Sequence, residues 1–411
     1  MYSEKITAEH CEQIEKRLGI KLHRYTPAQS HELTDYLGKL HAEGKLVDGS
    51  GRYVNPSYAE FIRNETILFQ QDFFYALRYM KIMMDGVEGG GIGYFNPWES
   101  QKILLDRICA LEEQNQDYFK KGYPCDGILI CDNKGGRQLG HTMISRAISM
   151  HRFIGWPYTR CLAASVDEDK VLELYDRDKL IIESLPFFLK PASWGQQGGG
   201  YDKKGEHIHI EGLGSKILYQ QSKQQSGLGT GRQFDVSHLT ELSSWPYPRM
   251  VEVDFLPTLP QNPYTFCLFE TTPLGRGNWW HEFSERVRKK KMPRWTYMYI
   301  PFYAEPKKYR RHPPEGWAPS EQTLQMAWKV HQTSPEFIGK AVTLTREQLY
   351  WWETSFQEAL ENNSLNMFLS NYSYTPEMSF QATTYSAINP EVMEWMRSTT
   401  VDGYAYEVEG L

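Results

Sequence analysis

The segment DGILICDNKGGRQLGHT, which spans residues 126–142, decides the fold. It begins with a short apolar run, Gly127 to Cys131, that predicts a buried strand, and a helical pattern follows from Thr142 to Phe153. Between the two lie Gly135, four further residues and the triplet Gly140-His141-Thr142. This spacing matches the phosphate-binding loop G-x-x-x-x-G-K-S/T except at the lysine, where the chain has a histidine. The segment therefore predicts a phosphate loop, with an ordinary glycine turn as the alternative.

The chemistry of a phosphate loop assigns a role to each part of this stretch. Glycines let successive backbone N–H groups turn inward around phosphate oxygens, and the next helix directs its positive end at the same anion. The Thr142 hydroxyl lies where a Mg²⁺ ligand is needed. A neutral histidine does not replace a fixed ammonium, so Lys134 or Arg137 must supply that charge. We expect ATP to be bound by Lys134, Gly135, Gly136, Arg137, Gln138, Leu139, Gly140, His141 and Thr142.

A second apolar strand, Phe234 to Leu239, ends in Thr240-Glu241. In nucleotide hydrolases an acidic pair at such a strand end coordinates Mg²⁺ and polarises the attacking water. Here Thr240 replaces the first acid and would hold a metal-bound water by hydrogen bonding. Glu241 remains as the candidate general base. The alternative is a solvated glutamate at a strand end.

A third strand, Thr265 to Glu270, is followed by Thr271-Thr272. These hydroxyls are expected at the carboxyl edge of the sheet, where ligands of open α/β folds bind. Arg276, between two glycines, would reach a phosphate or a neighbouring subunit, or lie in a surface turn.

The rest of the chain supports an α/β architecture. Further strands are expected at Arg160 to Val166 and Thr296 to Phe302, alternating with helices such as Asn278 to Lys290. This alternation predicts a largely parallel sheet covered by helices on both faces. The interval 186–231 interrupts it and is expected to form a hairpin. The first 85 residues read as helices, one running from Ser57 to a glycine-rich stretch at 86–93, which we interpret as a hinge rather than a second phosphate loop.

Composition excludes several classes of protein. The 411 residues carry a net charge of -6, so the chain is not a basic nucleic-acid coat. Charge is uneven, because residues 286–311 hold ten Lys/Arg and one acid, whereas residues 353–411 hold nine acids and one arginine. The six cysteines are scattered, which favours a reduced, intracellular protein, and no apolar run is long enough to cross a membrane.

In combination, these segments resemble the large terminase subunit of tailed double-stranded DNA phages, the ATPase that pumps the genome into the capsid. That family's phosphate loop often reads R-Q-x-G-x-T, as in residues 137–142. Its second strand often ends H-x-S-E, close to residues 238–241, and its third motif reads S-T-x-x-G-x-G-N, close to residues 271–278. Phe95 to Trp98 with Gln101 resembles the segment that holds adenine. Residues 300–303 and 344–348 resemble the linker that follows the motor.

The resemblance implies a fold and an activity. It implies a P-loop ATPase core at 86–300, a helical extension at 1–85 and a lid or linker at 301–411. ATP and Mg²⁺ would be the cofactors, Glu241 and Arg137 the catalytic residues, and Thr271 with Thr272 the coupling residues. The basic residues Arg276, Arg286, Arg288, Lys289, Lys290 and Lys291 would contact DNA or a neighbouring subunit.

The same resemblance implies partners and a place of work. They are double-stranded DNA, the portal of the procapsid and the small terminase subunit, with the chain monomeric in solution and assembled into a ring in the host cytoplasm at the portal vertex. No DNA cleavage is expected from this chain, because the carboxylates Asp402, Glu407 and Glu409 are too few for a nuclease fold. Two alternatives stay open: another DNA-dependent, helicase-like ATPase, and a nucleotide-binding scaffold with little turnover.

Overall fold

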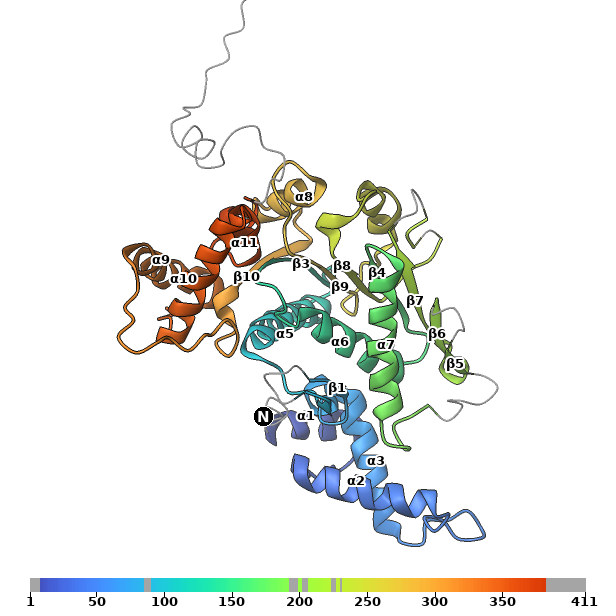
Figure 1. The fold of residues 1–411 in the computed structure, drawn as a ribbon. Helices are drawn as coiled ribbons and strands as arrows, with labels where there is room; N and C mark the ends of the chain where they lie inside the picture. Colours follow the sequence, from blue (N-terminus) through green and yellow to red (C-terminus); the bar gives the residue numbers. More distant parts are fainter. Residues whose placement is uncertain are drawn as a thin grey trace, which may run out of the picture.

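A computed structural model describes residues 8–84, 90–191, 199–201, 206–222, 227–229 and 231–381 (Figure 1). Its centre is an eight-stranded sheet with the order β10-β3-β9-β8-β4-β7-β6-β5. The first six strands in this order run parallel, and β6 and β5 are antiparallel to their neighbours. The strands are β3 (Ile128–Gly135), β4 (Arg160–Ser165), β5 (Gly199–Tyr201), β6 (His207–Ile210), β7 (Ser215–Gln221), β8 (Val236–Thr240), β9 (Phe266–Thr271) and β10 (Trp295–Pro301).

The sheet confirms the α/β, mostly parallel architecture that the sequence predicts. The five strands expected from apolar runs are β3, β4, β8, β9 and β10. The expected hairpin exists as β6 and β7, and β7 also pairs with β4, so the excursion extends the main sheet. The order differs from chain order because β9 lies between β3 and β8, and this brings three predicted strand ends together.

Helices cover both faces of the sheet (Figure 1). On one face α5 (Glu99–Lys120), α6 (His141–Gly155) and α7 (Glu168–Ser184) pack on a core that includes Ile130, Leu268 and Ala163. On the other face α8 (Trp279–Arg288) packs with the short turns η4 (Leu242–Ser244), η5 (Val251–Phe255) and η6 (Leu256–Thr258), over Phe269 and Cys267. Alternate residues of β9 thus face two cores, as the period of a strand requires.

The N-terminal region is helical, as expected, but its long helix ends earlier than predicted. The helices are α1 (Ala8–Leu18), α2 (Pro27–Ala42), α3 (Pro56–Gln71) and α4 (Phe73–Ala76). Asn55 caps the start of α3 through Ser57 N–H. Asp72 then leaves the helical conformation and caps α4 by accepting from the backbone N–H of Tyr75, so the prediction of one helix up to residue 85 is wrong.

Two short strands lie on either side of residue 86, where the glycine-rich stretch begins. The strands β1 (Lys81–Met83) and β2 (Ile92–Tyr94) pair antiparallel around it. The domain boundary expected between residues 85 and 86 therefore falls between two paired strands. Residues 85–89, which include most of the expected hinge, lie outside the described part of the chain.

The C-terminal region forms a separate helical cluster beside β10 (Figure 1). It starts at the turn η7 (Phe302–Ala304) and has its own core around Phe302, Met326 and Trp352. Its helices are α9 (Glu321–Ile338), α10 (Arg346–Glu361), α11 (Leu365–Asn371) and α12 (Pro376–Ser379). The acidic tail beyond residue 381, with Asp402, Glu407 and Glu409, lies outside the described residues.

Two further observations complete the fold. Among the described helices, none is long and apolar enough to span a bilayer. All six cysteines are free thiols.

Candidate functional site

Three strand ends meet on one face of the sheet. Asp132 of β3 pairs in register with Glu270 of β9, which pairs in register with Thr240 of β8. Neighbours in register on parallel strands point to the same face, here the face that α6 covers. The predicted loop crosses the top of this row and enters α6 at His141.

The loop has the backbone that anion binding needs. Gly140 has φ 77° and precedes α6, and no side chain among the described residues caps the first N–H groups of the helix. The other glycines are required by packing. A Cβ at Gly135 would lie 2.3 Å from the Tyr299 hydroxyl, and one at Gly136 would lie 2.8 Å from Phe302 Cα. The alternative of an ordinary glycine turn also accounts for Gly135 and Gly136.

Glu270 is the centre of the site, and it is fully buried. Its Oε1 accepts from the Thr142 hydroxyl at 2.5 Å and lies 2.9 Å from His238 Nε2. Its Oε2 accepts from Lys134 Nζ at 3.2 Å. One carboxylate thus connects the hydroxyl predicted to bind Mg²⁺ with the cation predicted to replace the loop lysine.

Burial and pairing set the charges here. Burial works against the charged form of Glu270, but Lys134, His238 and Thr142 more than offset it and hold the pKa of this carboxyl well below its usual range. Burial likewise opposes the charge on Lys134, yet the carboxylates of Glu270, Glu241 and Asp132 leave its pKa raised. Burial lowers the pKa of His238 despite its bond to Glu270. At neutral pH the site therefore holds an ionised glutamate, an ammonium and a neutral His238.

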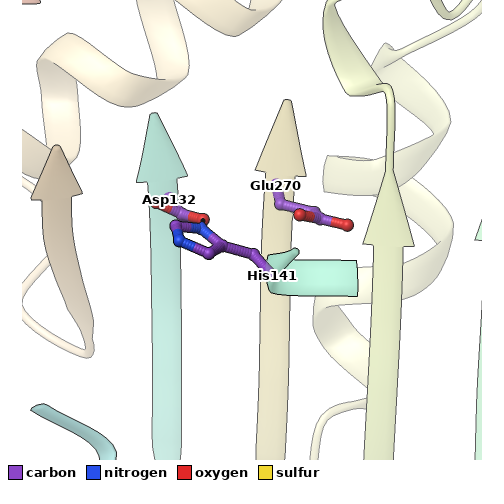
Figure 2. Close-up of side chains that lie close together, drawn as sticks. All are labelled: Asp132, His141 and Glu270. Carbon is purple, nitrogen blue, oxygen red and sulfur yellow. Dashed lines mark hydrogen bonds and ion pairs between the residues drawn. The ribbon is translucent and has the colours of Figure 1, made fainter. Parts of the chain in front are cut away.

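His141 turns away from the position of a loop lysine. Its Nδ1 lies 2.5 Å from Asp132 Oδ2, and both side chains are buried (Figure 2). His141 Nε2 and Asp132 Oδ1 have no hydrogen-bond partner within the described part of the chain. One ligand atom each from Asp132, His141 and Glu270 lies within 4.8 Å of the others, which makes this a candidate metal group. The nearby hydroxyl and carboxylate oxygens are hard donors, which fit Mg²⁺.

Glu241, the residue after Thr240, has a strained backbone conformation. It has φ 58° and ψ 31°, an unusual backbone for a residue other than glycine, and its N–H donates to the backbone oxygen of Glu270. Its side chain is half-buried and makes no hydrogen bond or ion pair to the described residues. A strained, uncommitted carboxylate beside the site is consistent with a base that acts on a ligand.

Two other residues predicted to bind ATP, Arg137 and Gln101, differ in whether their side chains are hydrogen-bonded to the described residues. Arg137 is exposed, and its guanidinium has no partner among the described residues. Gln101 is buried, and its amide accepts from Trp98 N–H and donates to the Gly140 carbonyl, each at 2.8 Å. It therefore braces the loop.

Two residues of the C-terminal region also hold the loop. The Tyr309 hydroxyl donates to the Arg137 carbonyl, and Lys308 Nζ donates to the Gln138 carbonyl at 3.1 Å. Gly136 forms an isolated β-bridge with Tyr372. The loop is thus in direct contact with the expected lid or linker.

The predicted coupling residues are buried at the end of β9. Thr271 Oγ1 lies 2.8 Å from Ser243 Oγ, and Ser243 also donates to the Thr272 carbonyl at 2.7 Å. Ser243 belongs to η4, the turn that follows Glu241. These hydroxyls link the third motif to the turn that carries the candidate base, and their role in coupling stays a prediction.

The basic run around α8 is less free than its sequence indicates. Arg286 pairs with Glu252, Arg288 lies 2.5 Å from Glu377, and Lys289 lies 3.1 Å from Glu285. Lys290 and Lys291 are exposed and have no ion pair with the described residues. Arg276 follows β9, half-buried, before α8. Contact of this run with DNA stays a prediction. Lys290 and Lys291 would make most of that contact.

Sequence reasoning did not assign roles to Glu270 and Asp132. Glu270 ends one predicted strand and Asp132 follows another, and a charged residue at the edge of an apolar run is itself a signal, since burial of an unpaired charge is costly. What sequence could not provide was the register that places them beside Thr240.

No protein-family model matches the chain, and no curated protein matches it in sequence. Two solved structures are similar to it at low identity. The large terminase of bacteriophage HK97 matches with a TM-score of 0.38 and 9% identity over 58% of this chain and 45% of that one. A mutant ATPase domain of the large terminase of Thermus phage P74-26 matches with a TM-score of 0.34 and 15% identity over 44% of this chain and 78% of that one. The chain spans less than half the length of the HK97 protein.

Proposed function

We propose that this chain is an ATPase that uses hydrolysis to drive double-stranded viral DNA into a procapsid. One observation carries the ATPase part: a glycine loop, an uncapped helix start, an ion-paired Lys134–Glu270 and an uncommitted Glu241 converge at the carboxyl ends of β3, β9 and β8. This is the edge where open α/β sheets bind ligands.

The residues divide the work of phosphoryl transfer between them. Backbone N–H groups at the start of α6 bind the phosphate oxygens. Lys134 and Arg137 stabilise negative charge that develops on the transferred phosphate. Glu241 orients a water and accepts its proton. Thr142, with Thr240 through a bound water, would hold Mg²⁺, which would supply charge neutralisation to the nucleotide phosphates.

The packaging role rests on the sequence motifs. The order and content of residues 137–142, 238–241 and 271–278 resemble the large terminase subunit, and so do the residues before α5 and after β10. A portal, a small terminase subunit and a ring of copies are the partners that this role requires. Duplex DNA is the substrate that it moves.

Phosphate release from Mg²⁺–ATP tests the ATPase part. We expect Glu241→Gln to lower turnover about 100-fold or more, because loss of a general base costs that much in rate. Glu113→Gln, an exposed change on α5, is the matched control and should leave the rate unchanged. Turnover that persists in Glu241→Gln would refute the role of this residue.

Long duplex DNA, portal and procapsid test the packaging part. Stimulation of wild-type turnover by duplex DNA would support a DNA motor, and dependence on single strands or strand separation would favour the helicase-like alternative. Tight ATP binding without phosphate release in any mixture would favour the scaffold with little turnover. The buried His141–Asp132 pair, which leaves the loop without its usual cation, is the observation that favours that second candidate.

A further inference from the structure

The phosphate-loop hydroxyl in this chain pairs with a carboxylate on an unexpected strand. β8 ends at Thr240, directly before Glu241. In nucleotide hydrolases the metal-binding acid stands at the position of Thr240. Thr240 and Glu270 are direct neighbours in the parallel pairing of β8 with β9. The missing carboxylate is therefore present one strand away, at the same level and on the same face.

Contacts show which of the two residues serves the loop. Thr142 Oγ1 donates to Glu270 Oε1 at 2.5 Å. Among the described residues, the Thr142 hydroxyl makes no hydrogen bond to Thr240. The loop hydroxyl is thus already oriented by Glu270 from β9.

The second oxygen of Glu270 ties the same carboxylate to the replacement cation. Lys134 Nζ lies 3.2 Å from Oε2, and Lys134 has only 10% of its side chain exposed. A carboxylate that is fully buried and shared between a hydroxyl and an ammonium is held in one orientation. Such preorganisation is what a divalent cation with strict geometry needs from its surroundings.

We propose that Glu270 positions Mg²⁺ in this site, in place of the acid that β8 lacks at Thr240. The inference rests on the proposed ATPase function and adds a residue to it. Glu270 acts through the Thr142 hydroxyl and the water around the ion, so it is a positioning residue. The carboxylate that orients the loop hydroxyl thus stands on β9 instead of β8.

The test measures binding of a fluorescent ATP analogue to the full chain, with Mg²⁺ and with EDTA. The wild type should bind more tightly with Mg²⁺. Glu270→Gln should lose about 10-fold or more of that gain, the usual cost of removing a carboxylate around a metal, while its binding in EDTA changes little. Bound Mn²⁺, read by electron paramagnetic resonance with the analogue present, gives a second readout without turnover.

Moving the charge back makes the test specific. Glu270→Gln combined with Thr240→Asp places a carboxylate on β8 and should restore most of the Mg²⁺ gain. Another fully buried glutamate, Glu65, supplies the matched control, because Glu65→Gln also removes a buried carboxylate but lies in the N-terminal helices. If Glu270→Gln does not fold, Glu270→Asp keeps the charge but shortens its reach to Thr142, and it should lose part of the Mg²⁺ gain.

The outcomes separate the two proposals. Full Mg²⁺ dependence in Glu270→Gln, or in Glu270→Asp where Glu270→Gln does not fold, overturns the role of Glu270 and leaves the ATPase proposal standing. If Thr240→Asp does not restore the Mg²⁺ gain of Glu270→Gln, the proposal that Glu270 stands in for an acid at residue 240 is overturned. Absence of nucleotide binding by the folded wild-type chain overturns the proposed function and this inference with it.

Discussion

Glu65 in α3 and Glu270 in β9 are both fully buried, and their surroundings differ. Glu65 accepts hydrogen bonds from neutral groups, which are the hydroxyls of Tyr75, Tyr79 and Ser30 and the amide of Asn64. Glu270 is bonded to the ammonium of Lys134, to His238 and to the loop hydroxyl of Thr142. Burial alone therefore does not mark a functional acid.

The difference lies in where the partners come from. The partners of Glu65 belong to α2, α3 and the segment around α4, so this cluster joins N-terminal helices to each other. The partners of Glu270 come from β3, β8 and the start of α6, all of which border the glycine loop. A cation and an acid buried together at the edge where ligands bind indicate a site, whereas hydroxyls around an acid indicate a structural junction.

A buried histidine joins the N-terminal helices to α6, and its titration should lower stability in acid. His151 of α6 contacts the carbonyl oxygen of Phe69 in α3 through Nε2 at 2.7 Å. Burial lowers the pKa of His151 to about 4, against the opposing effect of that hydrogen bond. An unfolded chain takes up this proton from about pH 6.5 downward, so stability is present above pH 6.5 and is lost as pH falls to about 4.

We expect this loss to reach about 3 kcal/mol across that window, since each unit of pKa difference is worth about 1.4 kcal/mol. His151→Gln cannot titrate and should flatten the dependence of urea unfolding on pH between 7 and 4. His312→Gln, an exposed change, should leave the slope as it is. An equal slope in wild type and His151→Gln would show that acid acts elsewhere than at the junction.

Glu65→Gln sharpens the comparison between the two acids. The change replaces charge-assisted hydrogen bonds from three hydroxyls by neutral ones, and it should lower the free energy of unfolding by about 2 kcal/mol. Phosphate release should not change, because no partner of Glu65 borders the loop. Glu60→Gln, exposed on the same helix, is the control for stability. If Glu65→Gln altered the Mg²⁺ dependence of nucleotide binding, the division between junction and site would fail.

The smallest effect is expected where the C-terminal region holds the loop. Tyr309→Phe removes the hydroxyl that donates to the Arg137 carbonyl, a net loss of about 1 kcal/mol. If the bond preorganises the loop, nucleotide binding should weaken about fivefold in titration. Tyr350→Phe is the matched control, since its hydroxyl makes no hydrogen bond to the described residues. Unchanged affinity in Tyr309→Phe would mean that the loop keeps its shape without this contact.

Local patterns predicted the elements well. Apolar runs of strand length located β3, β4, β8, β9 and β10, because strands buried on both faces read as continuous hydrophobic stretches. The helix after Asn55 was placed correctly by its cap, but its end was not, since Asp72 begins a second helix by capping rather than by any break in hydrophobicity. Periodicity reports which face is buried, and caps decide where a helix stops.

The sequence by itself determined the alternation of strands and helices, the glycine loop before α6 and the carboxylate at Glu241, because each depends on residues close together in the chain. Only the tertiary structure decided that β9 lies between β3 and β8, and that Glu270, Lys134 and Thr142 therefore share one buried cluster. It also decided that Arg286 and Arg288 are paired with Glu252 and Glu377. Strand pairing and these ion pairs connect residues that are distant in sequence, so they exist only in the folded chain.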